Sequence, residues 1–114
     1  MQKILLILLI TATTLTACMS KTETYERKIR RTKLVQILAD MHLADAVAED
    51  QCRESRSKIF LQSKQYSNAI LKHYEVTQAD FDETWNYYTQ HPLEMDELYE
   101  QVIEEITKRE TQIK

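Results

Sequence analysis

Three side chains close together in the sequence are of types that bind metal ions. His42, Asp45 and Glu49 are spaced three and four residues apart, so on a helix they share one face. Imidazole and carboxylate groups bind transition metals, but bundle sites draw ligands from at least two helices. The sequence contains no Glu-x-x-His pair that would complete such a site. We therefore interpret these residues first as a solvated polar edge, and in the alternative as a small-ligand or metal-binding face.

A cysteine near the start of the chain suggests a different chemistry, which is lipid attachment. Lys3 precedes a run of isoleucine and leucine at residues 4–10, and Leu15-Thr16-Ala17-Cys18 follows as a lipobox. The 14 residues at 4–17 are too few for a membrane-spanning helix, which needs about 20. A thiol directly after the cleavage point can form a thioether to diacylglycerol. We therefore predict a signal peptide at residues 1–17 and a membrane anchor at Cys18.

The segment after the anchor is basic, whereas the rest of the chain is acidic. Residues 19–33 carry six basic and two acidic side chains, and residues 34–114 carry eight basic and sixteen acidic ones. We expect a basic tether at residues 18–32 ahead of a helical domain at residues 33–110. The tether would either lie against anionic lipid head groups or form a solvated linker. An acidic domain outside the cytoplasm is not suited to bind nucleic acid.

The sequence offers no motif for catalysis. It contains no glycine, which excludes the nucleophile elbow, the phosphate-binding loop and the dinucleotide-binding turn. With Cys18 lipidated, Cys52 is the only remaining thiol, so no disulfide within the chain is expected. We interpret Cys52 as a tolerated free thiol, with a disulfide between chains or a redox role as alternatives. We predict no enzyme activity, no catalytic residue and no cofactor.

The absence of glycine and the single proline, Pro92, predict an all-α fold. Helices are expected at residues 33–50, at residues 57–74, from a Thr77 N-cap to about Gln90, and from Pro92 to about residue 110. Thr32 is the expected N-cap of the first helix. We predict that three to four amphipathic helices form a small bundle, either an antiparallel four-helix bundle or an irregular array.

Apolar side chains at helical spacing predict which faces are buried. The third helix is expected to turn Phe81, Thr84, Trp85 and Tyr88 inward. Tyr87 and Tyr88 are adjacent, so one of them should be partly exposed and is a candidate partner contact. The expected buried stripe of the first helix comprises Leu34, Ile37, Leu38, Met41, Ala44, Val47 and Ala48.

Two stretches of the domain resemble a known family. The first is residues 33–46 (KLVQILADMHLADA), and the second is residues 76–82 (VTQADFD) continuing into residues 87–99 (YYTQHPLEMDELY). With the lipobox, they resemble small lipoproteins of Bacteroidota catalogued as domain of unknown function 4296, over about residues 32–107. The resemblance implies a helical extracytoplasmic lipoprotein with no assigned activity, cofactor or catalytic residue. Relatives often carry glycine or asparagine at the position of Glu75, where a left-handed helix cap would cost about 1 kcal/mol more than with glycine.

The residues after Cys18 indicate where the anchor would lie. Met19 stands where many Gram-negative lipoproteins retained in the inner membrane have aspartate, and residues 19–24 lack the acidic run of surface-exported ones. We therefore expect the outer membrane, with the domain facing the periplasm. The leading hypothesis is a non-enzymatic envelope lipoprotein that binds or supports a protein partner. The alternative is a small-ligand or metal-binding lipoprotein that uses His42, Asp45 and Glu49.

Overall fold

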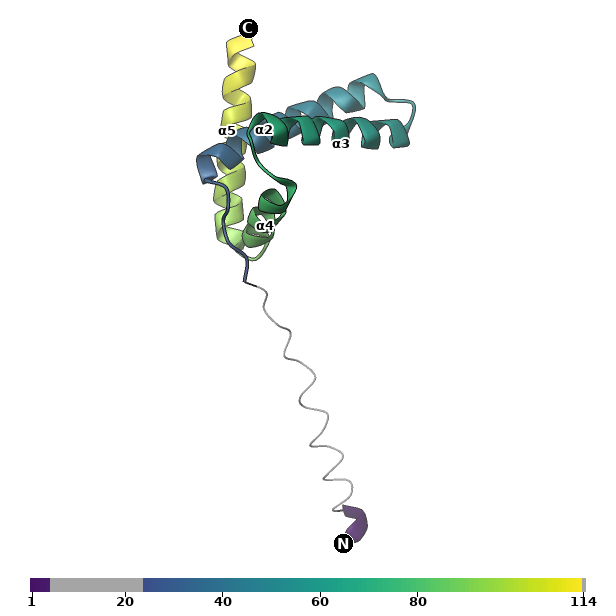
Figure 1. Cartoon of the computed structure of the whole chain (residues 1–114), viewed down its shortest axis with the longest axis vertical. Coiled ribbons are helices and arrows are strands. Elements are labelled where there is room, and N and C mark those ends of the chain that lie inside the picture. The colour runs from purple at the N-terminus through teal and green to yellow at the C-terminus, as the bar shows by residue number, and fades with distance from the viewer. Residues whose placement is uncertain (5–23, 114) are drawn as a thin grey trace.

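The protein is mainly helical in the part of the chain that the structure describes (Figure 1). A computed structural model describes residues 1–4 and 24–113. The long helices are α2 (Arg31–Gln51), α3 (Arg56–His73), α4 (Gln78–Thr89) and α5 (Pro92–Ile113), and no strand occurs within the described ranges. The predicted all-α fold is confirmed, and each expected helix lies within a few residues of its predicted bounds.

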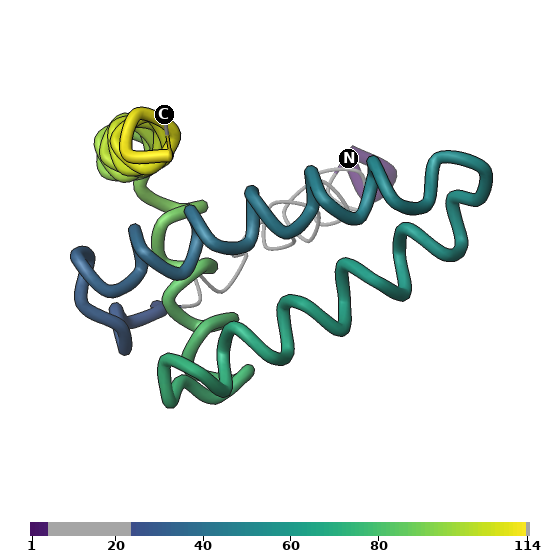
Figure 2. Tube along the Cα trace, turned by 90° about the horizontal axis from the view of Figure 1, so that it is seen from above, coloured from purple at the N-terminus to yellow at the C-terminus, as the bar shows by residue number. Residues whose placement is uncertain are grey.

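The four helices form two hairpins that cross. α2 and α3 run antiparallel, and α5 passes across α2 at a steep angle with α4 beside its first half (Figure 1). In Figure 2, α5 is seen end-on while α2 and α3 run side by side across the view. α2 contacts both α3 and α5, and α4 contacts α5. The arrangement is thus the irregular array, the second of the two predicted architectures, because α2 is sandwiched between helices of different direction.

The core lies where α2 crosses α4 and α5. It is built from the first half of α2, the end of α3 and the inward faces of α4 and α5. Thr84 and Tyr88 are both fully buried, as the predicted inward face of α4 requires. The buried apolar residues of this cluster are Ile29, Leu34, Val35, Ile37, Leu38, Ala39, Leu71, Tyr88, Leu98 and Val102.

Beyond this crossing, the α2–α3 hairpin extends as an arm, defined here as residues 42–67 (Figure 1). The arm consists of two helices alone, so its apolar side chains lack a third layer to cover them. Val47 is 45% exposed and Phe60 is 68% exposed. The prediction that Val47 lies in the buried stripe is therefore wrong, because helical periodicity does not show where a neighbouring helix ends.

Two helix termini show how the sequence sets the connections. The Thr77 side chain accepts a hydrogen bond from the Asp80 backbone N–H at 3.1 Å, which confirms the predicted N-cap of α4. The predicted cap at Thr32 is wrong, because α2 begins earlier and Arg30 occupies the N-cap position. The Leu34 N–H already donates to the Arg30 carbonyl at 2.9 Å, so Thr32 lies within the first turn.

The end of α3 requires an unusual backbone conformation at Glu75. This residue has φ of 55°, the left-handed region that glycine adopts more readily. The Glu75 N–H donates to the Lys72 carbonyl and the Val76 N–H to the Leu71 carbonyl, which is the Schellman pattern. Glu75 therefore holds the left-handed cap that the sequence analysis identified, at a cost of about 1 kcal/mol relative to glycine.

The segment before α2 belongs to the folded domain. Residues 24–30, which we call the strap, pass along α4 with Ile29 buried in the core. The backbone N–H groups of Lys28 and Ile29 both donate to Thr84 Oγ1, at 3.0 and 3.1 Å. The folded part therefore includes residues 24–30, with which the predicted tether at residues 18–32 overlaps. A buried threonine holds the strap in place.

The predicted anchor lies outside the described residues. Cys18 and the remainder of the lipobox fall between residues 5 and 23, as does most of the predicted signal peptide. Among the described helices, none combines the length and the apolar character that crossing a membrane requires.

Candidate functional site

An open groove runs along one side of the arm and ends against α4 and α5. Its inner pocket has a volume of about 230 Å³ and is lined from α2 by Leu38, Met41, His42 and Asp45. Its outer pocket, of about 660 Å³, lies between α2 and the first half of α3. Asp45 lines both pockets, so they are adjacent along α2, and together they are called the groove here. The face of α2 that the sequence analysis singled out thus forms the wall of a concave surface.

Aromatic side chains form the opposite wall of the inner pocket. Phe81 and Trp85 of α4 are stacked with ring centroids 6.3 Å apart, and Trp85 meets Tyr99 of α5 edge-on at 6.4 Å. The His42 ring lies 6.1 Å from the Tyr99 ring at a steep angle. Phe81, Trp85 and Tyr99 all remain partly exposed to solvent. The inner pocket therefore presents several aromatic surfaces to any molecule that enters it.

The structure does not support the predicted metal site. His42, Asp45 and Glu49 are all exposed, and Glu49 lies about 10 Å along the helix axis from His42. Within residues 1–4 and 24–113, no three His, Cys, Asp or Glu side chains are grouped so that they could hold a metal ion. The three residues instead spread along the groove, because no second helix brings ligands opposite them.

The outer pocket combines acidic, basic and apolar side chains. Asp45 and Glu49 line it from α2, and neither makes an ion pair or hydrogen bond with another described residue. Arg53 and Arg56 line its far end, where Arg53 pairs with Asp50 at 2.9 Å. The exposed Phe60 ring is also part of its wall. From the crossing outward, the groove is thus aromatic, then acidic, then basic.

The two tyrosines predicted as partner contacts have different environments. Tyr88 is fully buried in the core, which corrects its prediction as a surface contact. Tyr87 is partly exposed, but its ring stacks on His91 at 4.0 Å, with Arg27 5.2 Å from the ring centre. The Tyr87 hydroxyl donates to Glu94 at 2.8 Å, and this hydrogen bond raises the pKa of Tyr87. Tyr87 therefore makes contacts within the chain, with Arg27 of the strap, with His91 and with Glu94 of α5.

Part of the basic segment is paired with carboxylates of the domain. Arg27 and Arg31 each approach Glu94 of α5 to 3.6 Å, and Arg31 also reaches Glu97 at 3.1 Å. These pairs are partly exposed, so each contributes at most about 1 kcal/mol to stability. They nevertheless direct the strap along α5. Residues 24–31 are therefore not a solvated linker, and residues 18–23 lie outside the described part of the chain.

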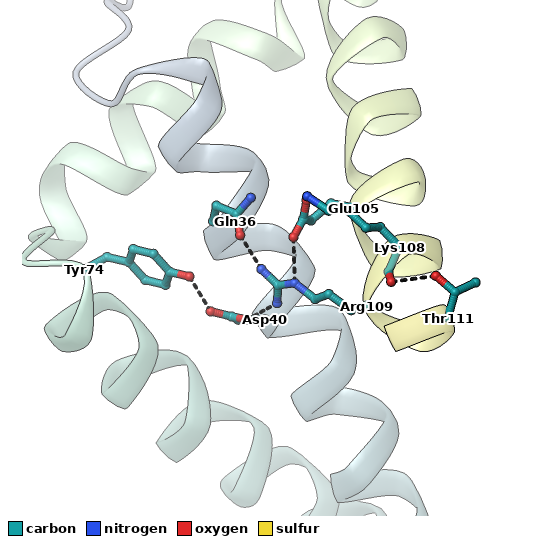
Figure 3. Close-up of polar contacts among 7 residues, drawn as sticks. All are labelled: Gln36, Asp40, Tyr74, Glu105, Lys108, Arg109 and Thr111. Carbon is teal, nitrogen blue, oxygen red and sulfur yellow. Dashed lines mark hydrogen bonds and ion pairs between the residues drawn. The ribbon is translucent and has the colours of Figure 1, made fainter. Parts of the chain in front are cut away.

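A polar network at the crossing of α2 and α5 was missed by the sequence analysis. Figure 3 shows Arg109 of α5 pointing between Gln36 and Asp40 of α2, with which it forms hydrogen bonds. Arg109 also bonds Glu105 at 2.8 Å, and the Tyr74 hydroxyl donates to Asp40 at 2.6 Å. The only signal in the sequence was that Arg109 continues the inward stripe of α5, seven residues after Val102.

The charges in this network stabilise one another. Burial lowers the pKa of Arg109, but its hydrogen bonds to Glu105 and Asp40 outweigh that effect and raise it above the ordinary value. The hydrogen bond from Arg109 lowers the pKa of Glu105. Burial and the hydrogen bond to Asp40 raise the pKa of Tyr74. The network therefore joins α2, α3 and α5 at the base of the arm and fixes the direction in which the arm projects.

Cys52 lies at the end of the arm. It is partly exposed at the C-cap of α2 and forms no disulfide within the described residues. Its predicted alternatives, a disulfide between chains or a redox role, stay predictions.

The extent of the folded unit agrees with a comparison with known protein families. A family model described as domain of unknown function (DUF4296) matches residues 25–112. The chain belongs to this family. The DUF4296 match begins at Tyr25, inside the strap, so the family unit includes the strap as well as the four helices. Comparisons with curated proteins and with solved structures found no match.

Proposed function

We propose that this DUF4296 protein is a lipoprotein of the bacterial cell envelope whose helical domain binds a protein partner and catalyses no reaction. The lipobox supports location in the cell envelope, since a cleavable apolar segment followed by Cys18 is the pattern that lipid attachment requires. Met19 after Cys18 supports the outer membrane, with the domain facing the periplasm. The resemblance to lipoproteins of Bacteroidota also supports location in the cell envelope.

The observation that carries the binding role is the aromatic, solvent-open groove beneath the arm. Aromatic side chains are enriched at protein interfaces, where they bury a large area at little cost in side-chain entropy. Trp85 and Tyr99 present such rings in the inner pocket while remaining partly exposed. The inner pocket, at about 230 Å³, is smaller than the roughly 300 to 1,000 Å³ typical of small-molecule sites, whereas the outer pocket, at about 660 Å³, falls within that range. A protein side chain is therefore a better match to the inner pocket than a separate ligand.

The position of the strap ties the groove to the membrane in this proposal. The strap begins six residues after Cys18, and six residues extend at most about 20 Å. Because Thr84 and Glu94 hold the strap against α4 and α5, the lipid anchor would keep the whole domain near the membrane surface. The partner we propose is therefore an envelope protein that reaches the same layer.

Loss of the anchor is expected to release the protein from the membrane and to remove its partner. Cells producing the C-terminally tagged chain are crosslinked, and proteins bound to it are identified by mass spectrometry. We expect one envelope protein to be enriched with the wild-type chain and reduced at least about tenfold with Cys18→Ala, because dual acylation confers stable anchoring. Ser20→Ala is the matched control and should behave as the wild type.

Two outcomes of this experiment contradict the proposal. Failure of both the wild type and Cys18→Ala to enrich any specific envelope protein would reject the binding role. Equal membrane association of the wild type and Cys18→Ala in fractionated cells would reject the lipid anchor.

A further inference from the structure

We infer that the groove accepts one amphipathic helix of the partner, with an apolar side chain in the inner pocket and a basic side chain beside Asp45 and Glu49. This inference rests on the proposed binding function and specifies the segment that would be bound. It differs from the predicted use of the same α2 face, because Asp45 and Glu49 would contact a cationic side chain and no metal.

The shape of the groove favours a helix as the occupant. One wall is the straight side of α2 from Leu38 to Glu49, which spans about 17 Å or three helical turns. Recognition of an extended peptide commonly uses the edge of a sheet, and the described residues contain no strand to provide one. A helix laid beside α2 would place side chains two turns apart on one face toward the two pockets.

The inner pocket defines the apolar position of that helix. Phe81, Trp85 and Tyr99 line it together with Met41, and its solvent-accessible lining is mostly carbon. Filling it with one aliphatic or aromatic side chain would remove these partly exposed rings from water. Burial of such a side chain typically contributes about 1.5 to 3 kcal/mol. The inner pocket is therefore where we place the main anchor of the partner.

The charges along the groove define the next positions. Asp45 and Glu49 are one turn apart, exposed and without an ion pair among the described residues. They lie about 6 and 12 Å along α2 from Met41, so the nearest position on the same face of a partner helix is seven residues, or two turns, from the anchor, at about 10 Å. A lysine or arginine at that distance from the anchor would face both carboxylates. Arg53 and Arg56 follow at the far end and favour an acidic residue about one turn further on.

This order of anchor, base and acid also sets the direction of the partner. Reversing the helix with its apolar anchor kept in the inner pocket would point its basic side chain away from Asp45 and Glu49. The ion pairs along the groove would then be lost, which disfavours the reversed orientation. The groove therefore discriminates by pattern as well as by composition.

Photocrosslinking in cells tests this inference in the full chain. p-Benzoylphenylalanine replaces Phe60, which lines the outer pocket and is 68% exposed, or replaces Leu93, which is 80% exposed and lines neither pocket. We expect a protein adduct from position 60 and none from position 93. The crosslinked peptide should belong to an amphipathic helix with an apolar residue and a basic residue seven positions apart on the same face.

Charge reversal provides the matched comparison. In the chain crosslinked from position 60, Asp45→Lys with Glu49→Lys is expected to reduce the adduct at least about fivefold. Glu100→Lys with Glu104→Lys makes the same charge change at the same spacing on exposed positions of α5, and should leave the yield within about twofold. A general electrostatic attraction would respond equally to both pairs of substitutions.

Several outcomes would overturn the inference. Equal reduction by the two charge reversals, an adduct with a second copy of the chain, or a crosslinked segment without a basic residue would each contradict it. If affinity purification recovers a partner but position 60 yields no adduct, the groove is not the binding surface and the proposed function stands. If no partner is recovered by either method, both fail.

Discussion

Replacing Thr84 with valine is expected to lower the free energy of unfolding by about 2 to 4 kcal/mol. Valine has nearly the same shape but removes the hydroxyl that accepts hydrogen bonds from the Lys28 and Ile29 backbone. Thr84 is fully buried and Ile29 is 4% exposed, so at least one backbone N–H would remain in the core without an acceptor. An unsatisfied buried donor costs more than a hydrogen bond contributes when it forms.

Denaturation of purified residues 19–114 by urea measures this effect, with hydrogen exchange of the two amides as a local readout. Thr84→Ser retains the hydroxyl and loses only a methyl group, so it should be clearly less destabilising than Thr84→Val. The amides of Lys28 and Ile29 should exchange faster in Thr84→Val than in Thr84→Ser. Equal stability and equal exchange in the two variants would show that Thr84 does not hold the strap.

Replacing Arg109 with alanine is expected to destabilise the domain by about 2 kcal/mol and to loosen the base of the arm. The substitution leaves Asp40 and Glu105 without their shared cation, and it also removes the hydrogen bond to Gln36. The side chains of Arg109 and Asp40 are 24% and 29% exposed, so water offsets part of the loss. Arg109→Lys retains the charge but not the planar guanidinium that bonds several partners at once, so it should lower the free energy of unfolding by about half as much as Arg109→Ala.

The effect of Arg109 should depend on pH in a defined direction. Its hydrogen bond lowers the pKa of Glu105 below the ordinary value of 4.5. A carboxyl whose pKa is lowered by folding stabilises the folded state above its unfolded pKa, and this contribution is lost as the pH falls through the folded pKa. The difference in stability between the wild type and Arg109→Ala should therefore shrink below about pH 4.5. Urea denaturation of both proteins at pH 7 and at pH 3.5 measures this difference in stability. An equal difference at the two pH values would contradict the stabilising pair between Arg109 and Glu105.

The sequence was sufficient to predict the helices because their signals are local. Thr77 caps α4 through Asp80, Pro92 begins α5, and the apolar spacing of α4 placed Thr84 and Tyr88 inward. The absence of glycine and the single proline supported the all-α prediction. The family resemblance also carried through, since the DUF4296 match covers residues 25–112.

The crossing of the helices could not be predicted, because it depends on contacts between distant residues. Arg109 lies 69 residues from Asp40, and nothing near either residue indicates the other. The hydrogen bonds from the strap to Thr84 span 55 and 56 residues, so residues 24–30 resembled a free tether in composition. Helical periodicity predicted that Val47 is buried. This is wrong because α5 crosses only the first half of α2 (Figure 1), which the periodicity of α2 alone cannot indicate.

The candidate site was found in part. The sequence singled out the face of His42, Asp45 and Glu49, and the structure places that face along the groove. The sequence could not show that Trp85 and Tyr99 lie across the inner pocket from this face of α2, since these two residues come from α4 and α5. The adjacent tyrosines predicted one exposed ring, and Tyr87 is partly exposed. Its contacts with Arg27 and His91 could not be predicted, because the fold brings these residues together.

The mass of the protein isolated from membranes tests most directly whether the domain is a lipid-anchored module. We predict a chain that begins at Cys18, with residues 1–17 removed, and that carries diacylglycerol on the thiol and an acyl chain on the amino group. Tandem mass spectrometry of the N-terminal peptide locates both groups. A chain that retains Met1, or one in which Cys18 is unmodified, would contradict the anchor on which the proposed function depends.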